Sequence, residues 1–334
     1  MKRVGNLIKK IADPENIALA FYKAAKGKWH KSEVMYFSEN IEKKVKELQV
    51  LLLQGKLTQG RYCFFDIYDP KKRTIAVAPF EHRVAHHAIM NICDTYFDNK
   101  QIYHSYACRK GKGSAAAVDY VKNNICSSLW YLKLDVRKYF DSIPHEQLKC
   151  NLRNVFKDEQ LLILFNEIID NYHITSACRG IPIGNLTSQY FANHYLVKID
   201  RFIKEELKVK FYVRYMDDML LFNLSKVDAL RFEKLIRDCL FSELSLALKI
   251  SQINRVYCGI PFLGYRIYKH TIKLGNVARS RFVKRSNHYR RAFEHNIMTD
   301  EDVAVRMRAL LAFADRADIY ALKKKINLVH GSSL

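Results

Sequence analysis

Residues 211–222, which read FYVRYMDDMLLF, place two adjacent aspartates between two apolar runs. The runs at 211–215 and 219–222 are rich in aromatic and branched residues, as buried β-strands are. Because the acidic pair interrupts them, the pattern predicts a hairpin with Asp217 and Asp218 at its turn.

The segments around this hairpin alternate between strand and helix. We expect a strand at 130–136, helices at 146–156, 158–172 and 186–207, a helix at 226–241 and a strand pair near 256–268. This β-α-β-β-α-β order is that of a split-βαβ sheet and predicts an α+β fold. In such a sheet Asp135, at the end of its strand, lies beside the hairpin that carries Asp217 and Asp218.

The flanking regions differ in character. Residues 1–60 have helical periodicity, 62–67 and 74–78 predict a hairpin with a turn at 69–72, and 81–97 returns to helical spacing. From residue 269 onward the chain is expected to be helical, and its lysines and arginines outnumber its acids. We interpret this region as a separate helical subdomain.

The composition of the chain indicates which class of molecule it binds. The chain has 334 residues, 49% of them hydrophobic, and a formal net charge of +22. A surplus that large favours a polyanionic partner, above all nucleic acid. The absence of a long apolar run or a signal-peptide core predicts a soluble, intracellular protein without a membrane partner. The eight cysteines form no C-x-x-C pair and are expected to be reduced.

Three carboxylates, those of Asp135, Asp217 and Asp218, could converge on one point. Oxygen ligands of this kind suit Mg²⁺, and two such ions can drive an in-line displacement at phosphorus. The simpler interpretation, that the acidic pair only closes a turn, stays open at this point.

Two motifs resemble those of reverse transcriptases. Tyr215-Met216-Asp217-Asp218 looks like the YxDD motif of that family, and residues 134–141, LDVRKYFD, look like its first palm motif. Phe140 falls where the family places an aromatic gate against the 2′ hydroxyl of a nucleotide, although it could instead be an ordinary core aromatic.

Among reverse transcriptases, the chain most resembles those of diversity-generating retroelements. Residues 180–189, GIPIGNLTSQ, carry this resemblance, because intron and retron enzymes usually show Gln-Gly and Ser-Pro where this chain has Ile183-Gly184 and Ser188-Gln189. The segments 105–113 and 262–265 also look like family motifs, and the match runs over about residues 15–290.

The resemblance implies a right-hand polymerase fold. It implies N-terminal helices and fingers at 1–125, a split-βαβ (ferredoxin-like) palm at 126–268 with interleaved finger elements at about 173–190, and a basic helical thumb at 269–334. The implied activity is RNA-directed DNA synthesis that miscopies template adenines, with two Mg²⁺ ions as cofactors and Mn²⁺ as a substitute. The implied partners are dNTPs, the template-repeat RNA, the RNA/cDNA duplex and an accessory variability protein, a basic helical oligomer. The implied location is the cytoplasm of a bacterial, archaeal or phage-infected host.

The site residues follow from the same motifs. The expected catalytic and metal-binding groups are Asp135, Asp217 and Asp218, with Val136 as a further metal ligand. The expected dNTP contacts are Arg73, Lys71, Phe140, Ile183, Gly184, Gln189, Met216 and Lys249. The expected template and primer contacts are Arg109, Lys110, Lys112, Arg281, Lys284 and Arg285.

One substitution in this set bears on fidelity. Where related enzymes carry a glutamine, Ile183 offers no amide to hydrogen-bond in the nucleotide pocket. A site with fewer polar contacts discriminates less between substrates. We hypothesise that this contributes to infidelity at adenines.

Several alternatives remain at this stage. The chain could be a retron-like or phage-defence reverse transcriptase, or a catalytically silent RNA-binding scaffold with the same fold. The glycine- and lysine-rich loop 109–114 could be a plain surface turn, and the basic C-terminal region a solvated face. His82 and His86 share a helical face, but with no third ligand nearby we expect packed histidines rather than a metal site.

Overall fold

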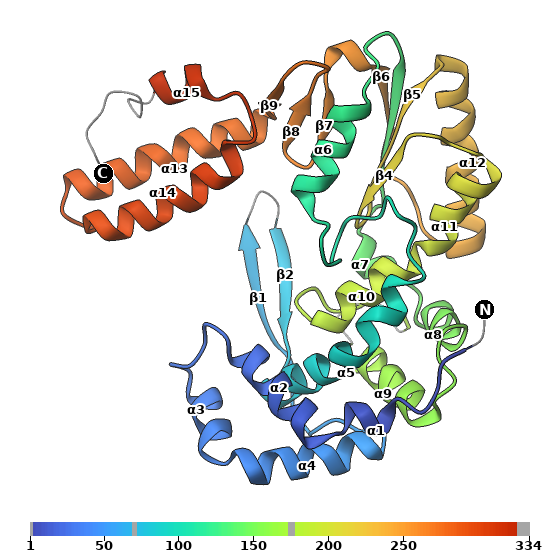
Figure 1. The fold of residues 1–334 in the computed structure, drawn as a ribbon, viewed down its shortest axis with the longest axis vertical. Helices are drawn as coiled ribbons and strands as arrows, with labels where there is room; N and C mark the ends of the chain where they lie inside the picture. The colour runs from blue at the N-terminus through green and yellow to red at the C-terminus, as the bar shows by residue number, and fades with distance from the viewer. Residues whose placement is uncertain (1–2, 69–71, 173–177, 326–334) are drawn as a thin grey trace.

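The structure is a computed structural model that describes residues 3–68, 72–172 and 178–325. Its N-terminal region is a layer of helices at one end of the molecule (Figure 1). Helix α2 begins at Pro14 because the Asp13 side chain accepts hydrogen bonds from the backbone N–H groups of Glu15 and Asn16. The helices of this layer are α1 (Ile8–Ile11), α2 (Pro14–Ala25), α3 (Ser32–Glu39), α4 (Ile41–Leu53) and α5 (Phe80–Asp98).

A two-stranded hairpin rises from this layer. Strands β1 (Cys63–Tyr68) and β2 (Lys72–Val77) pair in antiparallel register, and β1 runs from the helical layer toward helices α13 and α14 (Figure 1). Most of its residues are exposed on both faces. The expected helices at 1–60, the hairpin and the helix at 81–97 are therefore confirmed.

A four-stranded antiparallel sheet forms the centre of the molecule. Its strands are β3 (Trp130–Asp135), β4 (Tyr212–Tyr215), β5 (Asp218–Leu224) and β6 (Gln252–Arg255), in the spatial order β4-β5-β3-β6. This is the order of a split-βαβ sheet. The expected mixture of helix and sheet is confirmed.

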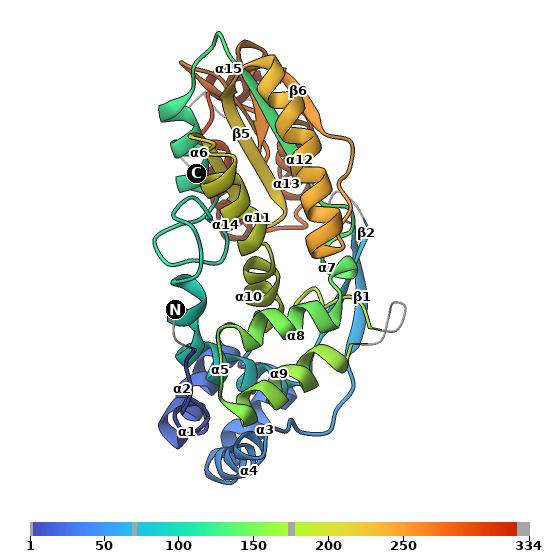
Figure 2. The same cartoon turned by 90° about the vertical axis from the view of Figure 1, so that its right-hand side faces the viewer.

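Both faces of this sheet are covered, and successive residues alternate between them. Leu132, Leu134 and Leu221 belong to one core cluster together with residues of α12, while Tyr131 and Leu220 belong to a second cluster together with residues of α6. Figure 2 shows α11 and α12 packed over the sheet on one side. The bounds of these helices are α6 (Ser114–Asn124), α11 (Val197–Arg201) and α12 (Lys226–Leu244).

The segment between β3 and β4 leads away from the sheet and back. It contains α7 (Tyr139–Ser142), α8 (His145–Arg153), α9 (Glu159–Asp170) and α10 (Leu186–Tyr195). The expected single helix over 186–207 is wrong, because α10 is followed by α11 and then by a π-helical turn, η1 (Phe202–Glu206). Leu196, at the junction of α10 and α11, has a ψ of 0° instead of a regular helical value.

The C-terminal part differs from the expectation in two places. The fourth strand of the central sheet is β6, which lies before the expected strand pair at 256–268. That pair, β7 (Ile260–Phe262) and β8 (Tyr265–Ile267), instead joins β9 (Ile272–Leu274) in a separate three-stranded sheet. The chain is therefore not helical directly after residue 269. Helices α13 (Asn276–Glu294), α14 (Asp300–Ala314) and α15 (Tyr320–Lys325) follow.

No helix in the described ranges is both long and apolar enough to cross a membrane.

Candidate active site

Strand register brings two of the predicted carboxylates together. Asp135 at the end of β3 is the direct partner of Asp218 at the start of β5. Partners in an antiparallel pair project from the same face of the sheet. Both side chains therefore project from the face of the sheet that also carries Tyr131 and Leu220. This face packs against residues of the C-terminal region.

The third carboxylate lies in the turn between β4 and β5. Because Tyr215 pairs with Asp218, the turn consists of Met216 and Asp217 alone. Met216 has a φ of +52°, the left-handed value that two-residue hairpin turns favour at this position. The tight turn places Asp217 next to the Asp135–Asp218 pair.

The electrostatics of the three acids show how close they are. Burial, together with the smaller effect of the neighbouring Asp135 charge, raises the pKa of Asp217 to about 6. Burial also raises the pKa of Asp218 to about 6, against the opposing effect of Lys133. The site therefore resists carrying its full negative charge without a cation.

Two lysines supply positive charge to the acids. Lys249 Nζ lies 2.5 Å from Asp135 Oδ1, and the Lys249 backbone N–H donates to the Asp135 carbonyl at 2.9 Å. Lys133 Nζ lies 3.2 Å from Asp218 Oδ2. Lys249, which is predicted to contact the dNTP, is thus paired in this structure with Asp135, a predicted metal ligand.

The carboxylates of the site are suitable ligands for a divalent cation, but the described residues do not form a preorganised coordination site. Asp218 Oδ1 is buried and has no hydrogen-bond partner in the described part of the chain, so it is an acceptor available to a cation. Within the same ranges no three His, Cys, Asp or Glu side chains form a preformed metal cluster. Val136 is buried and its backbone bridges to Leu248, which fixes the end of β3.

The predicted nucleotide-pocket segment is held from two sides. Ile181 N–H donates to the Phe140 carbonyl at 2.9 Å, and the Ile183 carbonyl accepts from Ala76 N–H of β2 at 2.8 Å. Gly184 has a φ of +125°, and a Cβ built on it would lie 2.5 Å from the Ala76 carbonyl oxygen. Phe140 is partly buried against the larger core cluster.

The remaining predicted dNTP contacts lie around this segment. Arg73 is exposed on β2, opposite Ile67. Gln189 on α10 accepts a hydrogen bond from Cys108 Sγ at 3.3 Å. Lys71 lies outside the described residues.

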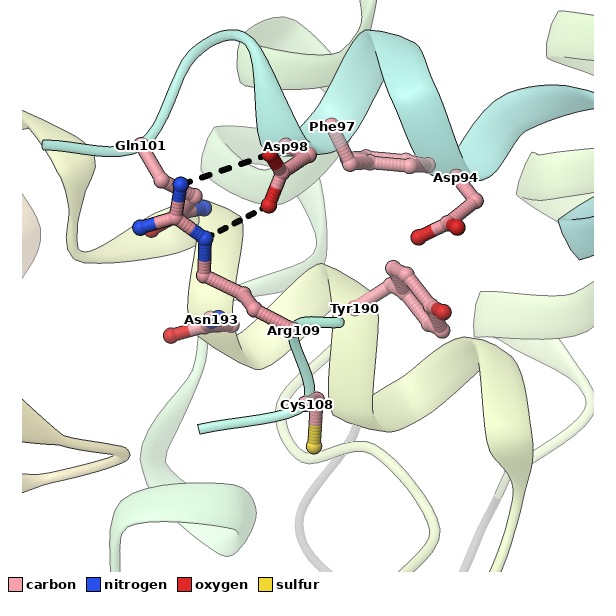
Figure 3. Close-up of a pocket in the computed structure, with 8 residues that line it drawn as sticks. All are labelled: Asp94, Phe97, Asp98, Gln101, Cys108, Arg109, Tyr190 and Asn193. Atoms are coloured by element: carbon pink, nitrogen blue, oxygen red, sulfur yellow. Dashed lines mark hydrogen bonds and ion pairs between the residues drawn. The ribbon is translucent and has the colours of Figure 1, made fainter. Parts of the chain in front are cut away.

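The predicted template-binding loop is anchored to the protein itself. Arg109 Nε lies 2.5 Å from Asp98 Oδ1 (Figure 3). Its Nη1 donates to the carbonyls of Ile102 and Ser105 at 2.6 and 2.8 Å. This placement favours a structural role for Arg109, and its contact with template stays a prediction. Lys110 is largely exposed beside Asp94, and Lys112 Nζ lies over the Tyr103 ring.

The predicted duplex contacts of the C-terminal region line a groove. Arg281, Lys284 and Arg285 of α13 face this groove together with Tyr68 from the end of β1. The hairpin and α13 thus border one basic opening in the molecule.

Two histidines of α5, His82 and His86, are buried, as expected for packed side chains. His82 Nε2 hydrogen-bonds the Thr58 carbonyl at 2.6 Å, and burial lowers the pKa of His86 to about 3.

Sequence reasoning missed the buried charges beneath the turn. Asp200 and Arg214 are both fully buried and paired, with 2.6 Å between Arg214 Nη2 and Asp200 Oδ2. Two signals were available. Arg214 interrupts an apolar strand, and Asp200 follows directly on the apolar positions of its helix.

One comparison, with models of protein families, identifies the family of this chain. A sequence profile described as reverse transcriptase (RNA-dependent DNA polymerase) matches residues 68–267. The putative COX1/OXI3 intron 2 protein of Saccharomyces cerevisiae is 25% identical over 147 residues, covering 42% of this chain and 17% of that protein. The group II intron-encoded protein LtrA of Lactococcus lactis is 25% identical over 146 residues, covering 42% and 24%. Protein YkfC of Escherichia coli is 23% identical over 284 residues, covering 69% and 74%.

The matched lengths and the structural neighbours add context. The match covers 17–20% of the first three curated relatives. The structure of apo telomerase from Candida tropicalis aligns with a TM-score of 0.49 at 13% identity, covering 69% of this chain and 50% of that one.

Proposed function

The chain belongs to the reverse transcriptase (RNA-dependent DNA polymerase) family, and on that premise we propose that it is an RNA-directed DNA polymerase making error-prone cDNA in a diversity-generating retroelement. The observation that carries the polymerase activity is the meeting of Asp135, Asp217 and Asp218 at one end of the central sheet. A silent scaffold would have no need for this acidic cluster, in which burial raises the pKa values of Asp217 and Asp218.

Each residue of the site has a proposed part in nucleotidyl transfer. Asp135, Asp217, Asp218 and the Val136 backbone would hold two Mg²⁺ ions, or Mn²⁺ in their place. When bound, such ions activate a 3′ hydroxyl and neutralise the departing pyrophosphate. Lys249, already an ammonium beside Asp135, is placed to shift toward the triphosphate and give a proton to the leaving pyrophosphate.

The nucleotide would be recognised between the hairpin and the 181–184 segment. Arg73 on β2 would bind the triphosphate, with Lys71 as its assistant, since guanidinium pairs with phosphate oxygens in a bidentate way. Phe140, fixed through its backbone bond to Ile181, would close against a 2′ hydroxyl. Gln189 and Met216 would complete the pocket from α10 and from the turn.

We propose that the fold corresponds to a right hand of fingers, palm and thumb. We assign residues 1–125 to N-terminal helices and fingers, 126–268 to the palm with interleaved finger elements near 173–190, and 269–334 to the thumb. The basic groove between Tyr68 and α13 supports duplex binding by Arg281, Lys284 and Arg285. Lys110 and Lys112 would contact the template or primer from the neighbouring loop.

The mutagenic subtype depends on fewer residues. Its support is that the sequence contains both Ile183-Gly184 and Ser188-Gln189, whereas intron and retron enzymes usually show Gln-Gly and Ser-Pro at these places. The relatives named above include intron-encoded proteins, which favours a faithful intron- or retron-like enzyme as the second candidate. The mutagenic proposal includes a template-repeat RNA and a basic accessory protein as partners, and a cytoplasmic location.

Primer extension tests both levels of the proposal. A defined RNA template containing all four bases is copied with Mg²⁺ and dNTPs, and the cDNA is sequenced. A parallel arm adds the native template RNA and the accessory protein, and Asp218→Asn serves as the inactive control.

The outcomes separate the candidates. Metal-dependent cDNA with errors concentrated opposite adenine supports the mutagenic enzyme. Accurate cDNA keeps the polymerase and selects the intron- or retron-like alternative. No cDNA in either arm overturns the polymerase proposal.

A further inference from the structure

A fully buried ion pair lies directly beneath the turn that carries Asp217 and Asp218. Arg214 on β4 and Asp200 on α11 have no exposed side-chain surface. Arg214 Nε lies 2.7 Å from Asp200 Oδ1 and its Nη2 lies 2.6 Å from Oδ2, so the pair is bidentate. Burying two charges costs so much solvation that such a pair is weak support for a stabilising role.

The guanidinium also binds the turn itself. Arg214 Nη1 donates to the Met216 carbonyl at 3.1 Å. Met216 is the left-handed residue that gives the turn its shape, and the next residue is Asp217. The position of the turn is thus tied to a group that cannot move without leaving Asp200.

The same guanidinium reaches toward the loop that contains Arg109. Its Nη1 donates to Asn193 Oδ1 at 2.7 Å and its Nη2 to Gln101 Oε1 at 3.0 Å. Asn193 in turn donates from Nδ2 to the Ala107 carbonyl at 2.9 Å. Figure 3 shows Gln101 and Asn193 beside Arg109, which pairs with Asp98.

Backbone bonds strengthen the connection. Arg214 N–H donates to the His104 carbonyl at 3.0 Å, and Tyr106 N–H donates to the Arg214 carbonyl at 2.9 Å. The cavity beside Gln101 and Asn193 has a volume of about 10 Å³, room for about one water molecule. This cavity is too small to bind a substrate, and the hydrogen bonds of Arg214 and Asn193 link the surrounding protein segments instead.

We propose that Arg214, held by Asp200, is a positioning residue that sets the catalytic turn at a fixed place relative to the 104–109 loop. It acts through Met216 on Asp217 and Asp218, and through Asn193 and Gln101 on the loop before Lys110 and Lys112. The proposal rests on the proposed polymerase function for its kinetic consequence, but its structural consequence is independent of activity.

The conservative variant Arg214→Lys separates charge from geometry. A lysine keeps the positive charge opposite Asp200 but lacks the planar fork that spans Asp200, Asn193 and Met216 at once. A small misplacement of reacting groups costs up to about 100-fold in rate. We expect kcat to fall roughly 10- to 100-fold while KM for dNTP changes less than about 3-fold.

The matched control is Tyr195→Phe. Tyr195 is equally buried on α10, and its hydroxyl bonds Gln147 and the Leu244 carbonyl, away from the turn. This variant loses buried hydrogen bonds without touching the Arg214 cluster. We expect it to be less stable than the wild type and to keep its kcat.

Hydrogen–deuterium exchange on the full chain gives the readout that needs no activity. Arg214→Lys should speed exchange in peptides covering 215–219 and 104–109, and Tyr195→Phe should not. Asn193→Ala, which leaves the ion pair intact, should speed exchange at 104–109 and serves as the deciding variant if Arg214→Lys does not fold.

The proposal is overturned if folded Arg214→Lys exchanges like the wild type at both segments and retains its kcat, or if Asn193→Ala leaves the loop unchanged. If the wild type makes no cDNA, the polymerase proposal fails while the exchange data still decide the positioning role.

Discussion

Asp135 and Asp218 stand directly opposite each other across the β3–β5 pair. Their facing arrangement follows from backbone register, so it does not depend on flexible side chains. A shift of one residue in β5 would send Asp218 to the other face of the sheet. The two-residue turn between Tyr215 and Asp218 fixes the register of β5 against β4, and the pairing of β5 with β3 then sets Asp218 opposite Asp135.

The raised pKa of Asp218 predicts a pH-dependent effect of neutralising it. Its pKa in the folded protein is about 6, above the usual value of 3.8, so the unfolded chain ionises first as pH rises. The folded state loses stability between about pH 4 and 6, and the full cost remains above pH 6. Without metal, Asp218→Asn should therefore be more stable than the wild type at pH 8 by about 3 kcal/mol, and equal to it at pH 4.

Urea unfolding in EDTA at pH 4, 6 and 8 measures this difference. Asp238→Asn, at an exposed position on α12, is the control. A stability gain in Asp218→Asn that stays constant from pH 4 to pH 8 would refute the assignment.

The ion pair between Lys249 and Asp135 predicts that the lysine competes with a metal ion for this carboxylate. Its ammonium lies on Asp135 and must leave that oxygen before a divalent cation can use it. In Lys249→Met this competition disappears, so the Mn²⁺ concentration at half-saturation should fall about 3- to 10-fold. Calorimetric titration of Mn²⁺ without nucleotide, with exposed Lys234→Met as control, measures it. A higher or unchanged midpoint would show that Lys249 does not compete.

Phe140 predicts sugar selectivity. The residue is fixed through the Phe140–Ile181 backbone bond, so trimming its ring should open space without moving the segment. Phe140→Ala should raise the ratio of rNTP to dNTP incorporation by about 10- to 100-fold, the scale of a steric discrimination of 1–3 kcal/mol. Single-nucleotide extension with each substrate tests this, and Phe165→Leu, a change in the core, controls for loosened packing. An unchanged ratio would assign Phe140 to the core alone.

Ile183 predicts fidelity at adenine. Its carbonyl is bound to Ala76 N–H, so replacing the side chain leaves the backbone in place. Ile183→Gln restores an amide to the pocket and should lower misincorporation opposite template adenine several-fold while other template bases change little. Sequencing of cDNA from both proteins measures it, with Ile183→Leu as the matched apolar variant. Identical error spectra would remove Ile183 from the explanation.

Local sequence patterns were sufficient to predict the acidic residues of the site. They were insufficient to predict the buried residues that hold the catalytic turn in place. The strands that carry Asp135 and Asp218 were predictable because apolar runs and a two-residue turn specify them locally. The break after Tyr195 was not, since apolar spacing continues through it and the cause lies in packing. The Asp200–Arg214 pair was missed because charged residues are usually assigned to the surface, and only the folded chain shows them paired.

Gly184 carries a consequence for building chimaeras between relatives. The carbonyl of Ala76 occupies the space where a side chain at position 184 would project. A donor segment with a side chain at position 184 would therefore clash with strand β2, although the two segments are distant in sequence. Residues 180–185 can be grafted alone only from a donor that has glycine at this position, and any other donor must supply its own hairpin as well.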